Sequence, residues 1–177
     1  MNKDYLQLEF DSLGSEANYK LADPTLVDYY KRVNNREILI NQDIDNKWFD
    51  SYLTNRNNCV RCSIVDEEDF ILGLVSLTNI DYTNLSCVFH IMIGENNQNK
   101  GAGTFAVREM LKHAFFNMNM HRVELTVLET NDRAIHLYEK CGFTKEGTKR
   151  RSTYKNGEYV NMHLYSILRE EYDLEVK

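Results

Sequence analysis

The sequence predicts a single mixed α/β domain over residues 1–177, with a mostly antiparallel sheet flanked by about four helices. Three observations predict it. The chain of 177 residues has the size of one domain. Residues 59–93 read as three successive strands joined by short polar turns, as in an antiparallel meander. Residues 85–142 read as strand, helix, strand and helix, and this order needs a crossover that makes one strand pair parallel.

Composition and charge restrict the class of protein. Hydrophobic residues make up 42% and charged residues 27%, which is typical of a globular chain and excludes general disorder. The net charge of −6 disfavours a nucleic-acid binder. We find no apolar run of the length that a membrane span needs and no signal-peptide pattern, so we expect a cytoplasmic protein with no membrane partner.

The charge is divided unevenly between the two halves of the chain. Residues 1–90 contain 8 basic and 15 acidic residues, a net charge of −7, whereas residues 91–177 contain 13 and 12, a net charge of +1. Such a difference also arises by chance on solvated faces. If it is functional, the first half favours a cation and the second half tolerates an anion.

The first 58 residues give the weaker patterns. Tyr5–Phe10 alternates like an edge strand. Helices are predicted from Asp23-Pro24 to about Asn35, and from Asp43 or Asp45 through Leu53. The segment between them, Ile38–Asp43, is predicted to be a loop.

The rest of the chain has clearer periodicity. The expected elements are strands at 60–64, 70–80, 85–93 and 123–128, helices at 101–118 and 132–141, and a closing hairpin of strands 144–154 and 158–168. Gly142 is expected to end the second of these helices, and Lys155-Asn156-Gly157 to form the hairpin turn. Strands 85–93 and 123–128 should be the parallel pair.

The four cysteines do not indicate a metal site. Cys59 and Cys62 form a C-x-x-C within a strand, and no second Cys or His pair at zinc spacing follows. We therefore expect no metal, and four reduced cysteines.

One segment suggests a phosphate site. Strand residues Ile91–Ile93 lead through a loop to Gly101 and Gly103, which open a helix. A helix N-terminus presents unpaired backbone N–H groups, and glycine lets phosphate oxygens approach them closely. Gly-x-Gly alone is weak evidence for a phosphate site, because tight helix packing without a ligand explains it equally well. It lacks both the Walker pattern and the third glycine of a dinucleotide fingerprint.

A second segment, Asn131–Phe143, lies about 30 residues further on. With it, the chain resembles the GNAT superfamily of acyl-CoA-dependent N-acetyltransferases. Gln98-x-x-Gly101-x-Gly103 resembles the Q/R-x-x-G-x-G/A pyrophosphate loop of that family. The second segment resembles its N-x-x-A-x-x-x-Y-x-x-x-G-F pattern through Asn131, Ala134, Tyr138, Gly142 and Phe143. The resemblance covers roughly residues 59–168.

The resemblance implies a GNAT fold, in which the central parallel strands splay apart and acetyl-CoA lies in the gap as co-substrate. Pantetheine amides would then replace the missing ladder bonds. It also implies a homo-oligomer such as a dimer, and a small-molecule amine as the second partner. The implied CoA-binding residues are Met92, Ile93, Gln98, Asn99, Lys100, Gly101, Ala102, Gly103, Thr104, Asn131, Ala134 and Tyr138.

The resemblance makes Tyr138 the catalytic acid that protonates the CoA thiolate. A phenol with a pKa near 10 holds its proton until a thiolate develops. The alternative is that Tyr138 is only a core aromatic on an amphipathic helix. His90, Glu124 and Glu129 near the splayed ends are candidate bases, although a residue of each kind is more often structural. Proton removal through water would need no fixed base.

The sequence does not decide which amine accepts the acetyl group. The second half resembles both spermidine/spermine and sugar-nucleotide 4-amino acetyltransferases, while ribosomal-protein acetyltransferases share the motifs but modify a protein amine. Polyamine enzymes usually carry a glutamate where this chain has Ser76, whereas Ile40–Gln42 followed by Lys47–Phe49 looks more like the sugar-nucleotide branch. Trp48, Phe49 and Tyr52 are candidates for the acceptor wall. A non-catalytic CoA-binding module is the alternative from another functional class.

Overall fold

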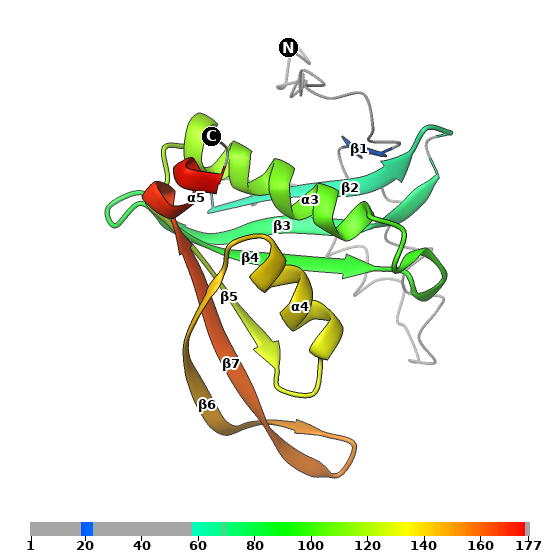
Figure 1. The fold of residues 1–177 in the computed structure, drawn as a ribbon, viewed down its shortest axis with the longest axis vertical. Helices are drawn as coiled ribbons and strands as arrows, with labels where there is room; N and C mark the ends of the chain where they lie inside the picture. The colour runs from blue at the N-terminus through cyan, green and yellow to red at the C-terminus, as the bar shows by residue number, and fades with distance from the viewer. Residues whose placement is uncertain (1–18, 23–57, 69, 176–177) are drawn as a thin grey trace, which may run out of the picture.

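The computed structural model describes residues 19–22, 58–68 and 70–175 of the chain. Its strands form one seven-stranded sheet in the order β1-β2-β3-β4-β5-β7-β6 (Figure 1). All neighbouring strands are antiparallel except β4 and β5, so the predicted sheet type and its one parallel pair are confirmed. The strands are β1 (Tyr19–Ala22), β2 (Cys59–Asp66), β3 (Ile71–Asp81), β4 (Ser86–Ile93), β5 (Arg122–Leu128), β6 (Thr144–Lys155) and β7 (Glu158–Leu168).

The described helices lie mainly in the crossovers on either side of β5. They are η2 (Glu95–Asn97), α3 (Ala102–Lys112), η3 (His113–Asn117), α4 (Asp132–Lys140) and α5 (Arg169–Glu175). The helix predicted at 101–118 is found as α3 continued by η3, whose last turn is π-helical because the N–H of Met118 donates to the carbonyl of His113. Among these helices none is long and apolar enough to cross a membrane.

The core lies between α3 and the face of the sheet that α3 covers (Figure 1). On α3 the buried positions recur at helical spacing, and on β5 they alternate, so each of these two elements turns one apolar face inward. Burial of one such large side chain contributes about 1.5–3 kcal/mol. The core includes Val75, Leu77, Phe89, Ala106, Val107, Met110, Leu111, Val123, Leu125 and Ile167.

The central parallel pair is joined at one end only. β4 and β5 pair at three positions, the last being Val88 with Glu124. Beyond that point β4 stays paired with β3 as far as Ile93, and β5 stays paired with β7 as far as Leu128. Figure 1 shows the two strands starting together and pointing apart. The expected splay is therefore present, and we call this opening the fork.

The local turns follow the predicted chemistry. Asn156 and Gly157 both have positive φ, as a two-residue hairpin turn between β6 and β7 requires. Gly142, also at positive φ, follows α4 as expected. β1 was not predicted, because four residues are too few to show a strand periodicity. The strand predicted at 5–10, the helices at 23–35 and 43–53, the loop 38–43 and the wall of Trp48, Phe49 and Tyr52 lie outside the described residues.

The C-x-x-C pair is split by the pleat of β2. Cys59 pairs with Thr78 and Cys62 with Val75 on β3, and three positions along a strand place side chains on opposite faces. None of the four cysteines forms a disulfide. The described residues also contain no group of three or more His, Cys, Asp or Glu side chains that could hold a metal ion.

Candidate active site

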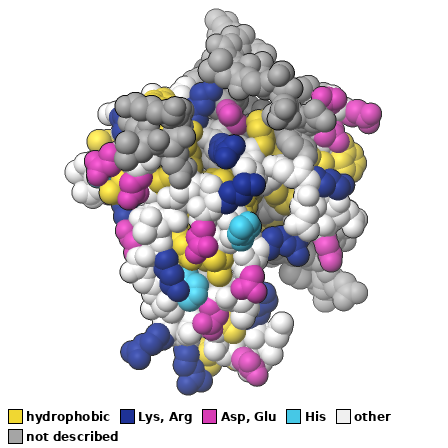
Figure 2. Space-filling model, in the orientation of Figure 1, with side chains coloured by type: hydrophobic (Ala, Val, Ile, Leu, Met, Phe, Trp, Pro, Cys, Tyr) yellow, Lys and Arg dark blue, Asp and Glu magenta, His cyan; other side chains and the backbone are white. Residues whose placement is uncertain are grey.

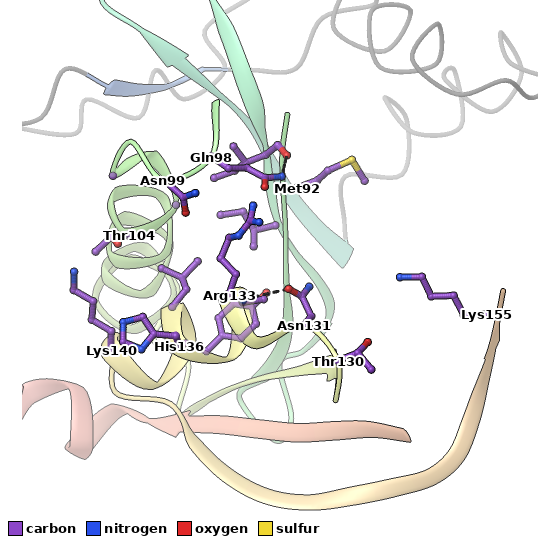
Figure 3. A pocket seen from close by; sticks show the side chains of 17 residues that line it. Met92, Gln98, Asn99, Thr104, Thr130, Asn131, Arg133, His136, Lys140 and Lys155 are labelled. Atoms are coloured by element: carbon purple, nitrogen blue, oxygen red, sulfur yellow. Dashed lines mark hydrogen bonds between the residues drawn. The ribbon is translucent and has the colours of Figure 1, made fainter. Parts of the chain in front are cut away.

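A pocket of about 640 Å³ lies between the open end of β4 and the helices α3 and α4 (Figure 3). This volume is in the range of small-molecule and cofactor sites. Its wall comes from segments that are far apart in the sequence: the end of β4, the loop before α3, the first turn of α3, α4 and the tip of β6. The lining residues are Ile91, Met92, Ile93, Gln98, Asn99, Gly101, Gly103, Thr104, Thr130, Asn131, Arg133, Ala134, His136, Leu137, Tyr138, Lys140 and Lys155.

The first turn of α3 presents backbone donors to this pocket. Gly101 is the N-cap, with φ at 93° in the left-handed region that glycine adopts most readily. The N–H of Phe105 bonds to the carbonyl of Gly101 at 3.1 Å, so the three N–H groups before it precede the intrahelical ladder. No acidic residue occurs in this turn. The positive end of the helix dipole therefore faces the pocket without a carboxylate of its own turn to neutralise it.

A loop residue, Gln98, and a residue of the first turn of α3, Gly103, determine how this turn packs against β4 and α4. The side-chain amide of Gln98 donates from Nε2 to the carbonyl of Ile93 at 3.0 Å, which ties the loop to the end of β4. A Cβ at Gly103 would lie 3.2 Å from both Ile93 Cδ1 and Leu137 Cδ2. Gly103 therefore permits a close approach of α3 to both neighbours, in addition to leaving room for a ligand.

α4 is positioned by its own cap. Asn131 precedes the helix, and its Oδ1 accepts a hydrogen bond from the N–H of Ala134 at 3.3 Å. Asn131 and Ala134 both line the pocket, at the side where β5 ends. The predicted N-x-x-A spacing thus builds a helix start and one wall of the pocket at the same time.

Tyr138 lies on α4 beside the closed end of the fork. Its ring meets Phe89 edge-on, with centroids 6.3 Å apart, and Phe89 is the first residue of β4 beyond the last pair with β5. Phe143 contacts the ring from a second direction at 5.8 Å. The residue is only 7% exposed, and burial raises the pKa of its phenol to about 12. Tyr138 therefore lines the pocket as a protonated phenol held in a fixed position.

The three candidate bases have different surroundings. Glu129 accepts hydrogen bonds from the N–H and Nδ2 of Asn161 at 3.2 and 2.8 Å, which lower its pKa and give it a structural role. Glu124 pairs with Arg122 at 3.3 Å. The Nε2 atom of His90 lies 2.9 Å from the hydroxyl of Thr78. Burial, and then the charge of Arg61, lower the pKa of His90, so its imidazole is neutral at pH 7.

The structure brings most of the predicted CoA-binding residues to one pocket. The exceptions are Ala102, which is buried in the core, and Lys100, which is exposed beside the pocket; neither lines it. Seven further lining residues were not predicted to bind CoA: Ile91, Thr130, Arg133, His136, Leu137, Lys140 and Lys155. Arg133, His136 and Lys140 recur at helical spacing on α4, and this spacing is the signal that could have identified them.

The matching family model is that of the acetyltransferase (GNAT) domain, over residues 12–144. The chain belongs to the GNAT acetyltransferase family. The match covers the glycine loop, α3, β5 and α4, and it ends where the closing hairpin begins. The fold expected from the resemblance is therefore confirmed.

Similar proteins include polyamine enzymes. The chain is 34% identical over 112 residues to a spermidine N(1)-acetyltransferase of Vibrio cholerae serotype O1, covering 63% of this chain and 65% of that protein. A solved structure of a spermidine N-acetyltransferase from Vibrio cholerae, in complex with CoA and spermine, superposes with a TM-score of 0.78 at 27% identity and covers 88% of this chain and 98% of that one. A dodecameric structure of a Vibrio cholerae spermidine N-acetyltransferase also has a TM-score of 0.78, at 26% identity, with 90% and 99% covered.

Proposed function

We propose that this GNAT enzyme transfers the acetyl group of acetyl-CoA to a primary amine of a small molecule, with CoA held in the pocket between β4, α3 and α4. The observation that carries the proposal is the fork beside the N-terminus of α3. A donor-rich helix start suits a pyrophosphate, and the separated strands have backbone groups that no neighbouring strand pairs. A solved relative in complex with CoA supports the same ligand.

Each part of the pocket would bind a different part of acetyl-CoA. The turn from Gln98 to Thr104 would hold the pyrophosphate through backbone N–H groups. The edges of β4 at Met92 and Ile93, with Asn131 opposite, would bind the amides of the pantetheine arm. This orientation directs the thioester toward the closed end of the fork, where Tyr138 lines the pocket.

The amine nitrogen then attacks the thioester carbon, the C–S bond breaks and the sulfur leaves as a thiolate. The Tyr138 hydroxyl donates its proton to that sulfur, and the amine loses a proton to solvent or to a base. Burial keeps the phenol protonated at any pH at which the enzyme works, because its pKa is about 12. A single group thus supplies the proton as charge develops on sulfur.

His90 is the best candidate to accept the amine proton among the described residues. It lies on β4 two positions beyond the last pair with β5, and its imidazole is neutral at pH 7. The contact with Thr78 fixes the orientation of the ring. The pairing of Glu124 with Arg122, and of Glu129 with Asn161, leaves those carboxylates less suited to the role.

Two classes of small-molecule acceptor have specific support. The spermidine acetyltransferase relatives favour a polyamine. A row of directly paired residues across the sheet favours an amino-sugar nucleotide instead. In this row Ser76 of β3 pairs with Arg61 of β2 on one side and with His90 of β4 on the other. That row contains a cation and no carboxylate, which suits a phosphate-bearing acceptor better than a polycation. The enzyme is further proposed to be cytoplasmic and to work as a homo-oligomer, as the dodecameric relative does.

A competition assay tests the proposal. Spermidine, a 4-amino-sugar nucleotide and the N-terminal peptide of a ribosomal protein are offered with acetyl-CoA, and kcat/KM is compared. We expect turnover with one of the two small molecules. Preference for the peptide would overturn the small-molecule assignment. Failure of the protein to bind acetyl-CoA at all would overturn the whole proposal, including catalysis.

A further inference from the structure

The outer half of the β6–β7 hairpin has little core of its own. β6 contains no buried residue, and β7 contains none before Tyr165. Figure 1 shows the hairpin projecting away from α3, and Figure 2, in the same orientation, shows basic side chains standing out at that end of the molecule. The tip nevertheless contributes Lys155 to the pocket. Because the tip buries so little apolar surface, its position depends on hydrogen bonds.

Asn161 of β7 joins the hairpin to the end of β5. Its side-chain oxygen Oδ1 accepts a hydrogen bond from the N–H of Arg151 on β6 at 2.7 Å. Its own N–H and its Nδ2 donate to the two carboxylate oxygens of Glu129 at 3.2 and 2.8 Å, and its carbonyl accepts from the N–H of Glu129 at 3.1 Å. One asparagine therefore connects three segments, which are β6, β7 and the residue that follows β5.

The bond to Arg151 holds the hairpin at a strained point. Arg151 has φ at 49°, in the left-handed region that a residue with a Cβ adopts only at a cost. The pairing of β6 with β7 shifts register between Lys149 and Thr153, so Arg151 lies in a bulge. Its guanidinium also lies 6.0 Å from the ring centroid of Tyr159 on β7. Such a conformation persists where its surroundings fix it, and it sets the direction in which β6 continues to Lys155.

The bonds to Glu129 hold a wall of the pocket. Glu129 directly precedes Thr130 and Asn131, and both of these residues line the pocket. Figure 3 shows the side chain of Lys155 extending from the tip of β6 toward these two residues. Asn161 is thus bonded both to the segment that carries this wall and to the segment that carries the cation. It is not itself among the described residues that line the pocket.

We propose that Asn161 is a positioning residue, which sets how closely Lys155 approaches the Thr130–Asn131 wall and thereby sets the affinity of the pocket for its anionic co-substrate. This inference rests on the proposed CoA site and adds to it a residue that acts from outside the pocket. Loss of the Asn161 side chain would release Arg151 from its left-handed conformation and would weaken the hold on Glu129. The ammonium group of Lys155 would then move relative to the wall, although no group that touches CoA had been removed.

A double-mutant cycle, measured by calorimetric titration of the whole protein with CoA, tests the inference. Asn161→Ala should weaken CoA binding about tenfold, and Lys155→Gln should weaken it several-fold through the loss of one charge. Because Asn161 acts through Lys155, the double variant should bind only as weakly as the more severe single variant, rather than by the product of the two factors. Asn161→Ala should also raise KM for acetyl-CoA and leave kcat within a few-fold, because Tyr138 keeps its contacts with Phe89 and Phe143.

Ser166→Ala is the matched control. Ser166 also lies on β7, and its Oγ donates to the carboxylate of Glu146 on the neighbouring strand at 2.7 Å, but it lies at the closed end of the fork and does not line the pocket. This variant should lower stability and leave CoA affinity unchanged. If Asn161→Ala does not fold, Glu129→Gln replaces it, because it removes one of the two acceptors that Asn161 uses; it should show the same coupling to Lys155.

The outcomes separate the two proposals. Additive effects of Asn161→Ala and Lys155→Gln, or an unchanged CoA affinity in folded Asn161→Ala, would overturn the role of Asn161 while the CoA site stands. An equal loss of affinity in Ser166→Ala would overturn it too, because any weakening of the sheet would then have the same effect. If the wild type does not bind CoA, the proposed function fails and the positioning role fails with it. A thermal melt of each variant shows whether the affinities are those of folded protein.

Discussion

Replacement of Tyr138 by phenylalanine tests the proposed chemistry most directly. The change removes only the hydroxyl, and the edge-on ring contacts with Phe89 and Phe143 remain. We therefore expect little change in stability or in KM for acetyl-CoA. Because the thiolate must then leave without a positioned acid, kcat should fall by roughly 10²–10⁴. Steady-state release of CoA thiol at saturating acceptor measures this change.

The pH dependence makes the test sharper. An exposed tyrosine with an ordinary pKa near 10 would lose its proton, and the enzyme its acid, as the pH approaches 10. Burial raises the pKa of Tyr138 to about 12 in the folded protein. The rate of the wild type should therefore show no loss from this group up to about pH 10. A falling limb centred near pH 10 that disappears in Tyr138→Phe would contradict the buried environment deduced here.

Tyr165 provides the matched control. It is also buried, its pKa is also raised to about 12, and its hydroxyl donates to Glu139 Oε1 at 2.9 Å, but it does not line the pocket. Tyr165→Phe should cost about 1 kcal/mol of stability for the lost hydrogen bond and leave kcat within a few-fold. The role of Tyr138 as the acid is refuted if its variant keeps most of the wild-type rate, or if both variants lose the same factor.

Three further outcomes are expected. Gly103→Glu should weaken CoA binding more than tenfold, because its carboxylate would enter the proposed phosphate site. The fold should survive, because the new Cβ would contact only the ends of two flexible side chains. Unchanged CoA affinity of a folded variant in calorimetry would contradict this expectation. Gly73→Ala should lower the free energy of unfolding by about 1–3 kcal/mol, because its Cβ would overlap the carbonyl oxygen of Met92. Gly147→Ala is the control: a Cβ there meets nothing within 4 Å, so the free energy of unfolding should change by less than about 0.5 kcal/mol. Equal denaturation midpoints for the two variants would refute the close approach at Gly73. The contribution of neutral His113 and His90 to stability should be fully present above about pH 6.5 and be lost as the pH falls through their lowered folded-state pKa values, because the unfolded chain binds those protons first. In urea titrations at pH 7.5 and 5.5, His113→Gln should lose less free energy of unfolding between the two pH values than the wild type. An identical loss in the two proteins would argue against this role of His113.

The sequence alone determined the features that depend on neighbouring residues. The glycine turn before α3, the end of α4 at Gly142 and the Asn156-Gly157 turn were predicted in place, because each follows from the conformational preferences of a few adjacent residues. The parallel pairing of β4 and β5 was also predictable, since a crossover between them permits no antiparallel pairing through a short turn.

Only the tertiary structure decided how distant segments meet. It placed Lys155 of the hairpin in the same pocket as Gln98 of the loop, brought Glu129 within hydrogen-bond distance of Asn161, and placed Ala102 in the core rather than in the pocket wall. Periodicity shows which face of an element is buried, but not what lies opposite it. Strand register and helix packing set that relation, and they depend on contacts between residues that are far apart in the chain.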